Sequence, residues 1–180
     1  MDLLVETLPR DAQIAFNRRR WEEVCADPTL AGLPHKIETD ALGHIIMMPP
    51  AKGSHSSAQS TIHLKLHDLM GARALVECPI STIGGVRTAD VGWYSPARYR
   101  EVNGQPAFER APEICVEVLS PSNTPREMAE KRDLYFEAGA DEFWICNPDG
   151  RLDFFLATNP DSPAVASKIC PGFPAQLPAS

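Results

Sequence analysis

The 180-residue sequence has no long apolar run, no paired-cysteine motif and no excess of positive charge. No stretch approaches the roughly 20 apolar residues that a membrane-spanning helix needs. The first residues carry acids where a secretion signal would have a basic start, so we expect a cytoplasmic protein. The five cysteines are odd in number, widely spaced and without a CxxC pair. That pattern favours reduced core thiols over disulfides or a zinc site.

The balance of charge is acidic, with 24 Asp and Glu against 17 Lys and Arg and a net charge of −7. Proteins that hold nucleic acid generally use a basic surface to displace counterions from phosphates. Any nucleic-acid contact of this chain must therefore be local. The best local candidate is the run Arg18, Arg19 and Arg20 in a predicted helix over residues 11–24, although a solvated helix face is the more common meaning of such a run.

Length and composition favour one domain over residues 1–180, since 43% hydrophobic residues suffice for a substantial core. Within it we distinguish an N-terminal helical segment (1–30) and a Pro-rich extension (158–180) that we expect to be mostly irregular. Helices and strands alternate, which indicates an α/β fold. Periodicity and turn signals predict helices over residues 11–24, 54–71 and 125–140, a short helix or turn over 96–102, and strands over 35–40, 44–50, 72–80, 86–94, 113–120, 141–148 and 151–157.

Two pairs of these strands are separated by short turns and are predicted to form hairpins. The first pair spans residues 35–50, and the second surrounds the turn signal Pro148-Asp149-Gly150. We expect the aromatic part of the second hairpin, from Phe143 to Phe155, to be exposed. Such a surface could pair across a two-fold axis, so a homodimer is possible.

The strand over residues 113–120, EICVEVLS, is apolar on both faces except for Glu117. Such a strand is typically covered on both sides, and a carboxylate there is costly unless a cation or hydrogen-bond donors meet it. The next helix offers a cation. Met128, Lys131, Tyr135 and Ala138 recur at helical spacing, which places Lys131 on the stripe that packs toward the sheet, where it could meet Glu117.

Asp90 is the one acid in the strand over residues 86–94, and aspartate is disfavoured in the interior of a strand. Asp90, Glu117 and the main-chain carbonyl of Val118, completed by waters, would give the oxygen shell that Mg²⁺ prefers, and Mn²⁺ could replace it. The metal would lower the pKa of a bound water and stabilise charge on a phosphate, while Lys131 would orient the nucleophile or offset charge. The alternative is purely structural: Glu117 and Lys131 form a buried ion pair and Asp90 caps a turn.

Several stretches then match a known pattern in order. KIETDALGHIIMMPPAKGSH has an acidic strand, a turn, an apolar strand ending in proline and a histidine, and Arg87-Thr88-Ala89-Asp90 is close to the motif R-x-P-D. The most specific block comprises Pro112, EVLSPS at 117–122, Lys131, Tyr135, Gly139 and FWICNP, and CPGF follows at 170–173. In these features the chain, from about residue 35 to 173, resembles the Uma-two family of restriction-endonuclease-like proteins in the PD-(D/E)XK superfamily.

The resemblance implies a restriction-endonuclease-like fold, with a central mixed β-sheet flanked by helices and additional N-terminal and C-terminal hairpins. It implies a metal-dependent endonuclease that hydrolyses phosphodiester bonds in nucleic acid, DNA foremost. Asp90 and Glu117 would be the acidic metal ligands. Many superfamily members carry a lysine two residues after the second acid; Leu119 stands there, and Lys131 would fill that role from the helix.

The same resemblance assigns supporting positions to Glu38, His55 and Gln59: Glu38 matches the family's early glutamate, a possible ligand through water, and the other two would neighbour the site. The chain departs from the family's pattern at Ala89, where proline is usual, and in its acidic net charge. A second hypothesis therefore stays open, a non-catalytic interaction module that keeps the fold and an acidic pocket.

Overall fold

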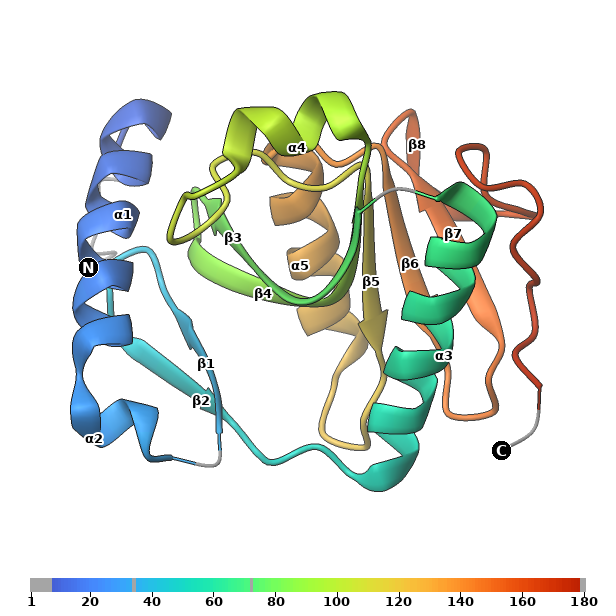
Figure 1. Cartoon of the computed structure of the whole chain (residues 1–180), viewed down its shortest axis with the longest axis horizontal. Coiled ribbons are helices and arrows are strands. Elements are labelled where there is room, and N and C mark those ends of the chain that lie inside the picture. The colour runs from blue at the N-terminus through green and yellow to red at the C-terminus, as the bar shows by residue number, and fades with distance from the viewer. Residues whose placement is uncertain (1–7, 34, 72, 179–180) are drawn as a thin grey trace, which may run out of the picture.

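The computed structural model describes residues 8–33, 35–71 and 73–178 (Figure 1). Residues 1–7 of the predicted N-terminal segment, residue 72 of a predicted strand and residues 179–180 of the Pro-rich extension lie outside this range. The elements in chain order are α1 (Arg10–Ala26), α2 (Pro28–Ala31), β1 (Lys36–Thr39), β2 (Ile45–Met48), α3 (Gly53–Met70), β3 (Arg73–Thr82), β4 (Gly85–Tyr94), α4 (Pro96–Val102), β5 (Ile114–Val118), α5 (Pro125–Glu137), β6 (Glu142–Cys146), β7 (Leu152–Leu156) and β8 (Asn159–Ala164).

A six-stranded mixed sheet in the order β3-β4-β5-β6-β7-β8 forms the centre of the fold. All neighbouring strands are antiparallel except β5 and β6, which run parallel and are joined by α5. A parallel pair needs such a crossover because the end of the first strand and the start of the second lie at opposite ends of the sheet. The predicted α/β class with a mixed sheet and flanking helices is confirmed.

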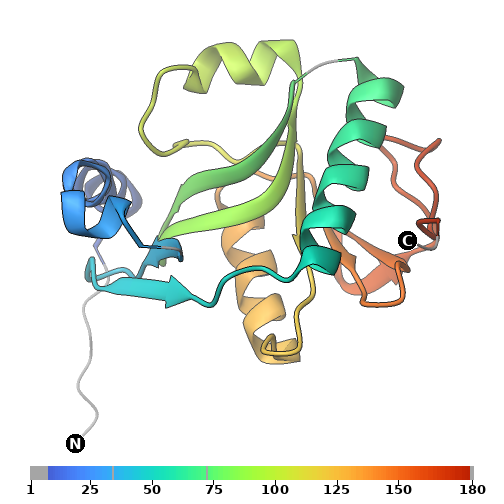
Figure 2. The ribbon, with the colours of Figure 1, turned by 60° about the horizontal axis from the view of Figure 1, so that its bottom comes forward.

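The sheet is covered on both faces, by α3 on one side and α5 on the other (Figures 1 and 2). Alternate side chains of β5 point to opposite faces of the sheet and contact different layers. Ile114, Val116 and Val118 pack with α3 and with the C-terminal segment, while Cys115 packs with Tyr135 of α5. Glu117 therefore points to the α5 side of a strand that is buried on both faces.

The predicted N-terminal hairpin is also confirmed, as a separate two-stranded sheet of β1 and β2. It docks on the start of β4 through polar contacts: the Val86 N–H donates to Thr39 Oγ1 (3.0 Å) and the Thr88 N–H donates to Glu38 Oε1 (3.0 Å). The approach is close at Gly85, where φ is +104° and a Cβ atom would lie 2.2 Å from the Thr39 carbonyl oxygen. A glycine is required there on both counts.

The aromatic hairpin is not exposed, which corrects the expectation from the sequence. Its strands β6 and β7 lie inside the sheet, each paired on both sides. Phe143, Trp144 and Phe154 are buried, and Trp144 packs against Phe173 of the C-terminal segment. The homodimer stays a prediction, but this hairpin does not offer its surface.

The Pro-rich extension is more regular than predicted, because residues 159–164 form β8 at the edge of the sheet. Only two residue pairs join it to β7, with an irregularity between them. Pro160 and Pro163 fit this place, since an edge strand needs ladder donors on one side only.

Two helix faces differ in part from the expected ones. In α3, the helical spacing of Ile62, Leu66 and Leu69 predicts one buried stripe; Ile62 and Leu66 are buried, but Leu69 is 49% exposed. In α1 the buried face starts with polar residues, and Asn17 donates from Nδ2 to Ser81 Oγ and to the Thr82 carbonyl (both 2.9 Å). These hydrogen bonds satisfy polar groups that would otherwise be costly to bury.

All five cysteines are free thiols; Cys25 is exposed and the other four are buried. No helix in the described ranges combines the length and the apolar character that a membrane span requires.

Candidate active site

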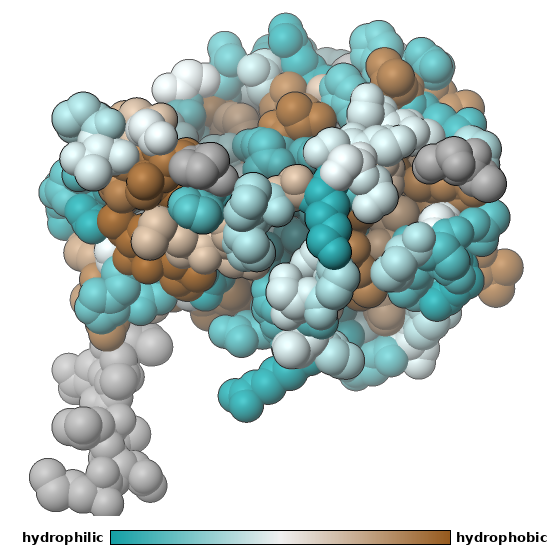
Figure 3. Space-filling model, turned by 90° about the horizontal axis from the view of Figure 1, so that it is seen from below, coloured by the Kyte–Doolittle hydropathy of each residue, from teal (hydrophilic) through white to brown (hydrophobic). Residues whose placement is uncertain are grey.

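A cavity of about 640 Å³ lies between the β1–β2 hairpin, the start of α3 and the loop that follows β5. Its lining includes the predicted residues Asp90, Glu117, Lys131 and His55. The surface on this lower side of the molecule is seen in Figure 3, where hydrophobic residues gather on the N-terminal part at the left and hydrophilic ones over the middle. Charged side chains of β1, β3, β4, β5 and α5 thus meet in one depression.

Asp90 lies in the interior of β4 and is buried. Its Oδ1 accepts a hydrogen bond from Lys36 Nζ (2.6 Å), and its Oδ2 accepts one from the Val118 N–H (2.7 Å). His55 Nε2 lies 3.5 Å from Oδ1. Burial opposes ionisation, but the hydrogen bond with His55 and the ammonium of Lys36 outweigh it and hold the pKa of Asp90 well below its usual range.

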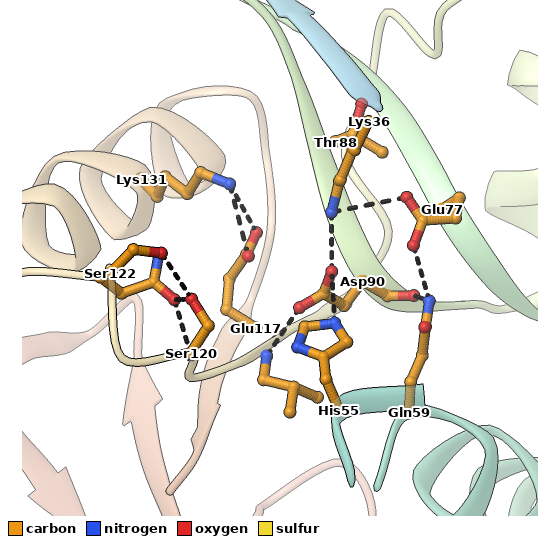
Figure 4. Close-up of polar contacts among 12 residues, drawn as sticks. Lys36, His55, Gln59, Glu77, Thr88, Asp90, Glu117, Ser120, Ser122 and Lys131 are labelled. Atoms are coloured by element: carbon orange, nitrogen blue, oxygen red, sulfur yellow. Dashed lines mark hydrogen bonds and ion pairs between the residues drawn. The ribbon is translucent and has the colours of Figure 1, made fainter. Parts of the chain in front are cut away.

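Glu117 is buried and points toward Lys131 of α5 (Figure 4). Lys131 Nζ lies 3.3 Å from each carboxylate oxygen, and the Tyr135 hydroxyl donates to Oε1 (2.8 Å). Burial raises the pKa of the Glu117 carboxyl to about 7, and the Lys131 ammonium opposes that rise. The predicted meeting of the carboxylate and the lysine is therefore present in the structure.

Glu38 holds Lys131 from the other side. Its Oε1 accepts a hydrogen bond from Lys131 Nζ (2.9 Å) and one from the Thr88 N–H. Burial would lower the pKa of Lys131, but the carboxylates of Glu117 and Glu38 outweigh it and raise that pKa. Glu38 is buried and is not among the residues that line the cavity, so its direct contact is with the lysine.

The position of Lys131 follows from how α5 begins. Thr124 is the N-cap: its side chain accepts from the Glu127 N–H while the Glu127 side chain accepts from the Thr124 N–H, a capping box. With the helix started there, Met128, Lys131 and Tyr135 face the sheet, as the spacing predicted. Residues 120–123, just before this cap, form a hydrogen-bonded turn that lines the cavity.

His55 and Gln59 lie one turn apart on α3 and both reach Asp90 (Figure 4). The hydrogen bond to Asp90 raises the pKa of His55, against the effect of burial. Gln59 Nε2 donates to the Asp90 carbonyl oxygen and to Glu77 Oε1, each at 2.8 Å. The structure thus places the two predicted supporting residues next to Asp90.

Two charged residues of this cluster were missed from the sequence. Lys36 Nζ contacts Asp90 and lies 3.5 Å from Glu77 Oε2. Both residues line the cavity. A signal existed for each: Lys36 shares a face of its strand with Glu38, and Glu77 is a lone acid in an apolar strand, the same pattern that singled out Asp90.

The structure contains one of the two features that the purely structural alternative predicts. Glu117 and Lys131 do form a buried ion pair, with Glu117 Oε1 3.3 Å from Lys131 Nζ. Asp90, however, caps no turn: it lies within β4 and binds the backbone of β5. Its geometry therefore needs another explanation than a turn cap.

The cavity offers oxygen donors of the kind that a hard divalent cation prefers. Asp90 and Glu117 line the same cavity, and both act on the ammonium of Lys36. Burial would lower the pKa of Lys36, but the two carboxylates, and Asp90 most strongly, raise it. Within the described ranges no three His, Cys, Asp or Glu side chains converge on a ready metal position. Two carboxylates with the Val118 carbonyl and water match the oxygen chemistry of Mg²⁺, which keeps several waters and uses one or two carboxylates. The residues fit such an ion in charge and donor type.

The arginine run on α1 takes part in surface ion pairs instead of facing the cavity. Arg18 pairs with Glu109, and Arg20 Nη1 lies 2.8 Å from Glu23 Oε2. The solvated-face interpretation of this run accounts for both contacts.

Comparisons with known proteins give matches of two kinds, a family model and solved structures. A family model described as "Uma2: Putative restriction endonuclease" matches residues 21–158. A solved structure, described as a putative nuclease of DUF820 from Anabaena variabilis ATCC 29413, superposes with a TM-score of 0.64 at 21% sequence identity, covering 87% of this chain and 93% of that one. At that identity the likeness shows the fold. A search of curated proteins gives no match.

Proposed function

The chain belongs to the Uma2 family and has a restriction-endonuclease-like fold, and from this premise we propose that it is a metal-dependent nuclease that hydrolyses phosphodiester bonds. One observation supports the proposal above the others. Asp90, Glu117 and Lys131 come from β4, β5 and α5 and line one cavity, with both carboxylates buried. Acids and a lysine concentrated in a cleft are typical of catalytic sites.

The proposed metal is Mg²⁺, with Mn²⁺ as a substitute. Asp90, Glu117 and the main-chain carbonyl of Val118 would hold it. When bound, it would supply the positive charge that acidifies water and neutralises a phosphate. Asp90 suits the role because its pKa is low and it stays ionised.

Lys131 is proposed to orient the attacking water or to offset negative charge on the phosphate. Its ammonium is directed by two acceptors, Glu38 and Glu117, so its position is fixed before substrate arrives. Glu38 and Tyr135 would act through these contacts as positioning residues. A rigid lysine loses less freedom on binding a phosphate than a surface lysine does.

Nucleic acid is the proposed substrate, with DNA tested first. The net charge of −7 argues against a broad basic binding face. Cations that line the cavity, Lys36, Lys52 and Lys131, can serve a local contact with the backbone instead.

The test is cleavage of plasmid DNA, single-stranded DNA and RNA with Mg²⁺ or Mn²⁺. We expect cleavage that chelation abolishes and that Asp90→Asn or Glu117→Gln lowers by about a thousandfold. Glu130→Gln is a matched control, because Glu130 is exposed on α5 next to Lys131. Absence of cleavage on every substrate, together with absence of metal binding in calorimetry, would contradict the proposal.

The second candidate is a non-catalytic interaction module. Ala89, in place of the proline expected before the metal-binding acid, and the acidic net charge favour it. Metal-dependent turnover that Asp90→Asn abolishes while the circular dichroism spectrum stays unchanged would rule it out.

A further inference from the structure

Lys36 lies between two carboxylates at the wall of the cavity (Figure 4). Its Nζ is 2.6 Å from Asp90 Oδ1 and 3.5 Å from Glu77 Oε2. The two acceptors differ in exposure: the Asp90 side chain is 5% exposed and the Glu77 side chain 47%. The ammonium therefore has one deeply buried partner and one partner near solvent.

Lys36 donates its hydrogen bond to Oδ1 of Asp90, the oxygen that a metal ion would also use. Oδ2 accepts a hydrogen bond from the Val118 N–H, whereas Oδ1 has both Lys36 Nζ (2.6 Å) and His55 Nε2 (3.5 Å) beside it, so positive charge gathers at Oδ1. Lys131, the other lysine of the cluster, is held by Glu117 and Glu38. A divalent ion bound at Asp90 would thus meet the ammonium of Lys36 at the same oxygen, and two cations at that distance repel each other.

Glu77 is held in a backbone conformation that few residues adopt. Its φ is +52°, the one positive φ among the described non-glycine residues. Such a conformation costs free energy, and strained residues gather at functional sites. Gln59 fixes Oε1 with a hydrogen bond of 2.8 Å and turns Oε2 toward Lys36. The residue with the strained backbone is therefore also the one whose carboxylate points toward the ammonium of Lys36.

We propose that Lys36 is the resident counter-cation of Asp90, that a divalent metal ion displaces it from Oδ1, and that Glu77 then receives the ammonium. This inference rests on the proposed metal-dependent function and deepens it by naming the group with which the metal competes. Before the metal arrives, Lys36 compensates a buried carboxylate that would otherwise be costly. Afterwards Glu77 keeps the lysine paired at the cavity wall.

The first test compares the affinity for Mn²⁺ alone, by titration calorimetry, between the native protein and Lys36→Met. Removal of the competing charge is expected to tighten binding about tenfold or more. Lys168→Gln is the control, since it removes one lysine charge at an exposed position outside the cavity lining. For Lys168→Gln we expect a change of less than about threefold. Equal or weaker binding by a folded Lys36→Met protein overturns the proposal.

Circular dichroism checks folding, and Lys36→Gln replaces Lys36→Met if the latter does not fold. Lys36→Arg keeps the charge and is expected to bind Mn²⁺ within about threefold of the native protein. Tenfold tighter binding by Lys36→Arg would count against displacement of a charge and overturn the proposal.

The second test examines Glu77 with a double-mutant cycle. Glu77→Gln alone is expected to weaken Mn²⁺ binding severalfold, because the displaced ammonium loses its acceptor. In the Lys36→Met background the same change should alter the affinity by less than about twofold. An equal loss in both backgrounds would mean that Glu77 acts on the metal directly, which overturns its role as the receiving group.

Neither test reads cleavage, so the two proposals fail in different ways. If the native protein binds Mn²⁺ and cleaves nucleic acid while Lys36→Met binds no more tightly, only the inference on Lys36 fails. If neither protein binds Mn²⁺, the metal-dependent function fails and the inference fails with it.

Discussion

The two buried acids of the site, Asp90 and Glu117, differ in the groups that compensate their charge. Asp90 has Lys36 and a backbone N–H; Glu117 has Lys131 and the Tyr135 hydroxyl. The difference appears in their pKa values, lowered for Asp90 and raised to about 7 for Glu117. Two acids that line one cavity are thus kept in different protonation equilibria by their neighbours.

The raised pKa of Glu117 predicts a pH dependence of stability in metal-free protein. A carboxyl with a higher pKa in the folded state binds its proton more tightly there. Its contribution is fully present below the ordinary value of 4.5 and is lost as the pH rises through about 7. The free energy of unfolding, measured by urea titration with a chelator, should therefore fall over this window by on the order of a few kcal/mol relative to Glu117→Gln.

Glu130→Gln serves as the control, because its exposed side chain should leave the pH profile as in the native protein. A native profile parallel to that of Glu117→Gln between pH 4.5 and 7 would show that Glu117 has no raised pKa.

The sequence located part of this cluster because a lone charge on an apolar face stands out. Glu117 and Lys131 were found in that way, and the structure brings them together. Lys36 and Glu77 also carried signals, but the sequence could not show that the two residues meet. Their partners lie 54 and 41 positions away along the chain, and the φ of Glu77 is a property of tertiary structure that residue type does not encode.

At the scale of elements, the site combines a local unit with a distant one. Glu117, Lys131 and Tyr135 come from the consecutive elements β5 and α5, so their spacing was visible in the sequence. Lys36 and Glu38 come from the hairpin, whose docking on β4 is a long-range event. Helical periodicity predicts the first kind of contact, while the second depends on how separate elements pack.

Gly85→Ala tests this docking. The new methyl group would lie 2.2 Å from the Thr39 carbonyl oxygen, and the positive φ adds backbone strain. We expect a loss of about 3 kcal/mol or more in the free energy of unfolding, measured by denaturant titration. A lower thermal midpoint should accompany it.

Gly104→Ala is the matched control. Gly104 also has a positive φ, +86°, but a Cβ atom there would meet nothing within 4 Å. It should cost only the strain, about 1–2 kcal/mol. Equal losses for the two variants would mean that the contact with Thr39 does not matter.

Two errors at this scale share a cause. Leu69 continues the apolar stripe of α3 but lies in its last turn and is 49% exposed. The aromatic hairpin has suitable residues for an interface but lies between β5 and β8 in the sheet, with α5 and the C-terminal segment packed on its faces. In both cases the sequence shows which residues are apolar, while the fold decides which of them are covered.

For the whole molecule, the net charge of −7 restricts how nucleic acid can bind. Log affinity for single strands changes by about −0.7 per phosphate contact for each unit of log salt concentration. Three contacts, one for each lysine of the cavity, are the upper limit, so binding of a labelled single strand under chelation should give a slope no steeper than about −2.

Lys52→Gln should make this slope shallower by about 0.7, and Lys168→Gln, a change at an exposed lysine outside the cavity lining, should leave it unchanged. A slope of about −4 or steeper would instead require a basic face elsewhere on the molecule.

The prolines of β8 have a consequence for solubility. The outer strands of the sheet are β3 and β8, and an open strand edge can recruit further strands from other copies and start aggregates. Pro160 and Pro163 remove two N–H donors from one edge, and Asp161 adds a charge between them. On the other edge, Phe108 is hydrogen-bonded to Pro79 and Ser81 of β3, and the left-handed residue Glu77 interrupts the extended backbone of that strand. The same strained residue that faces the cavity therefore also helps to limit the pairing of this edge with a strand of another copy.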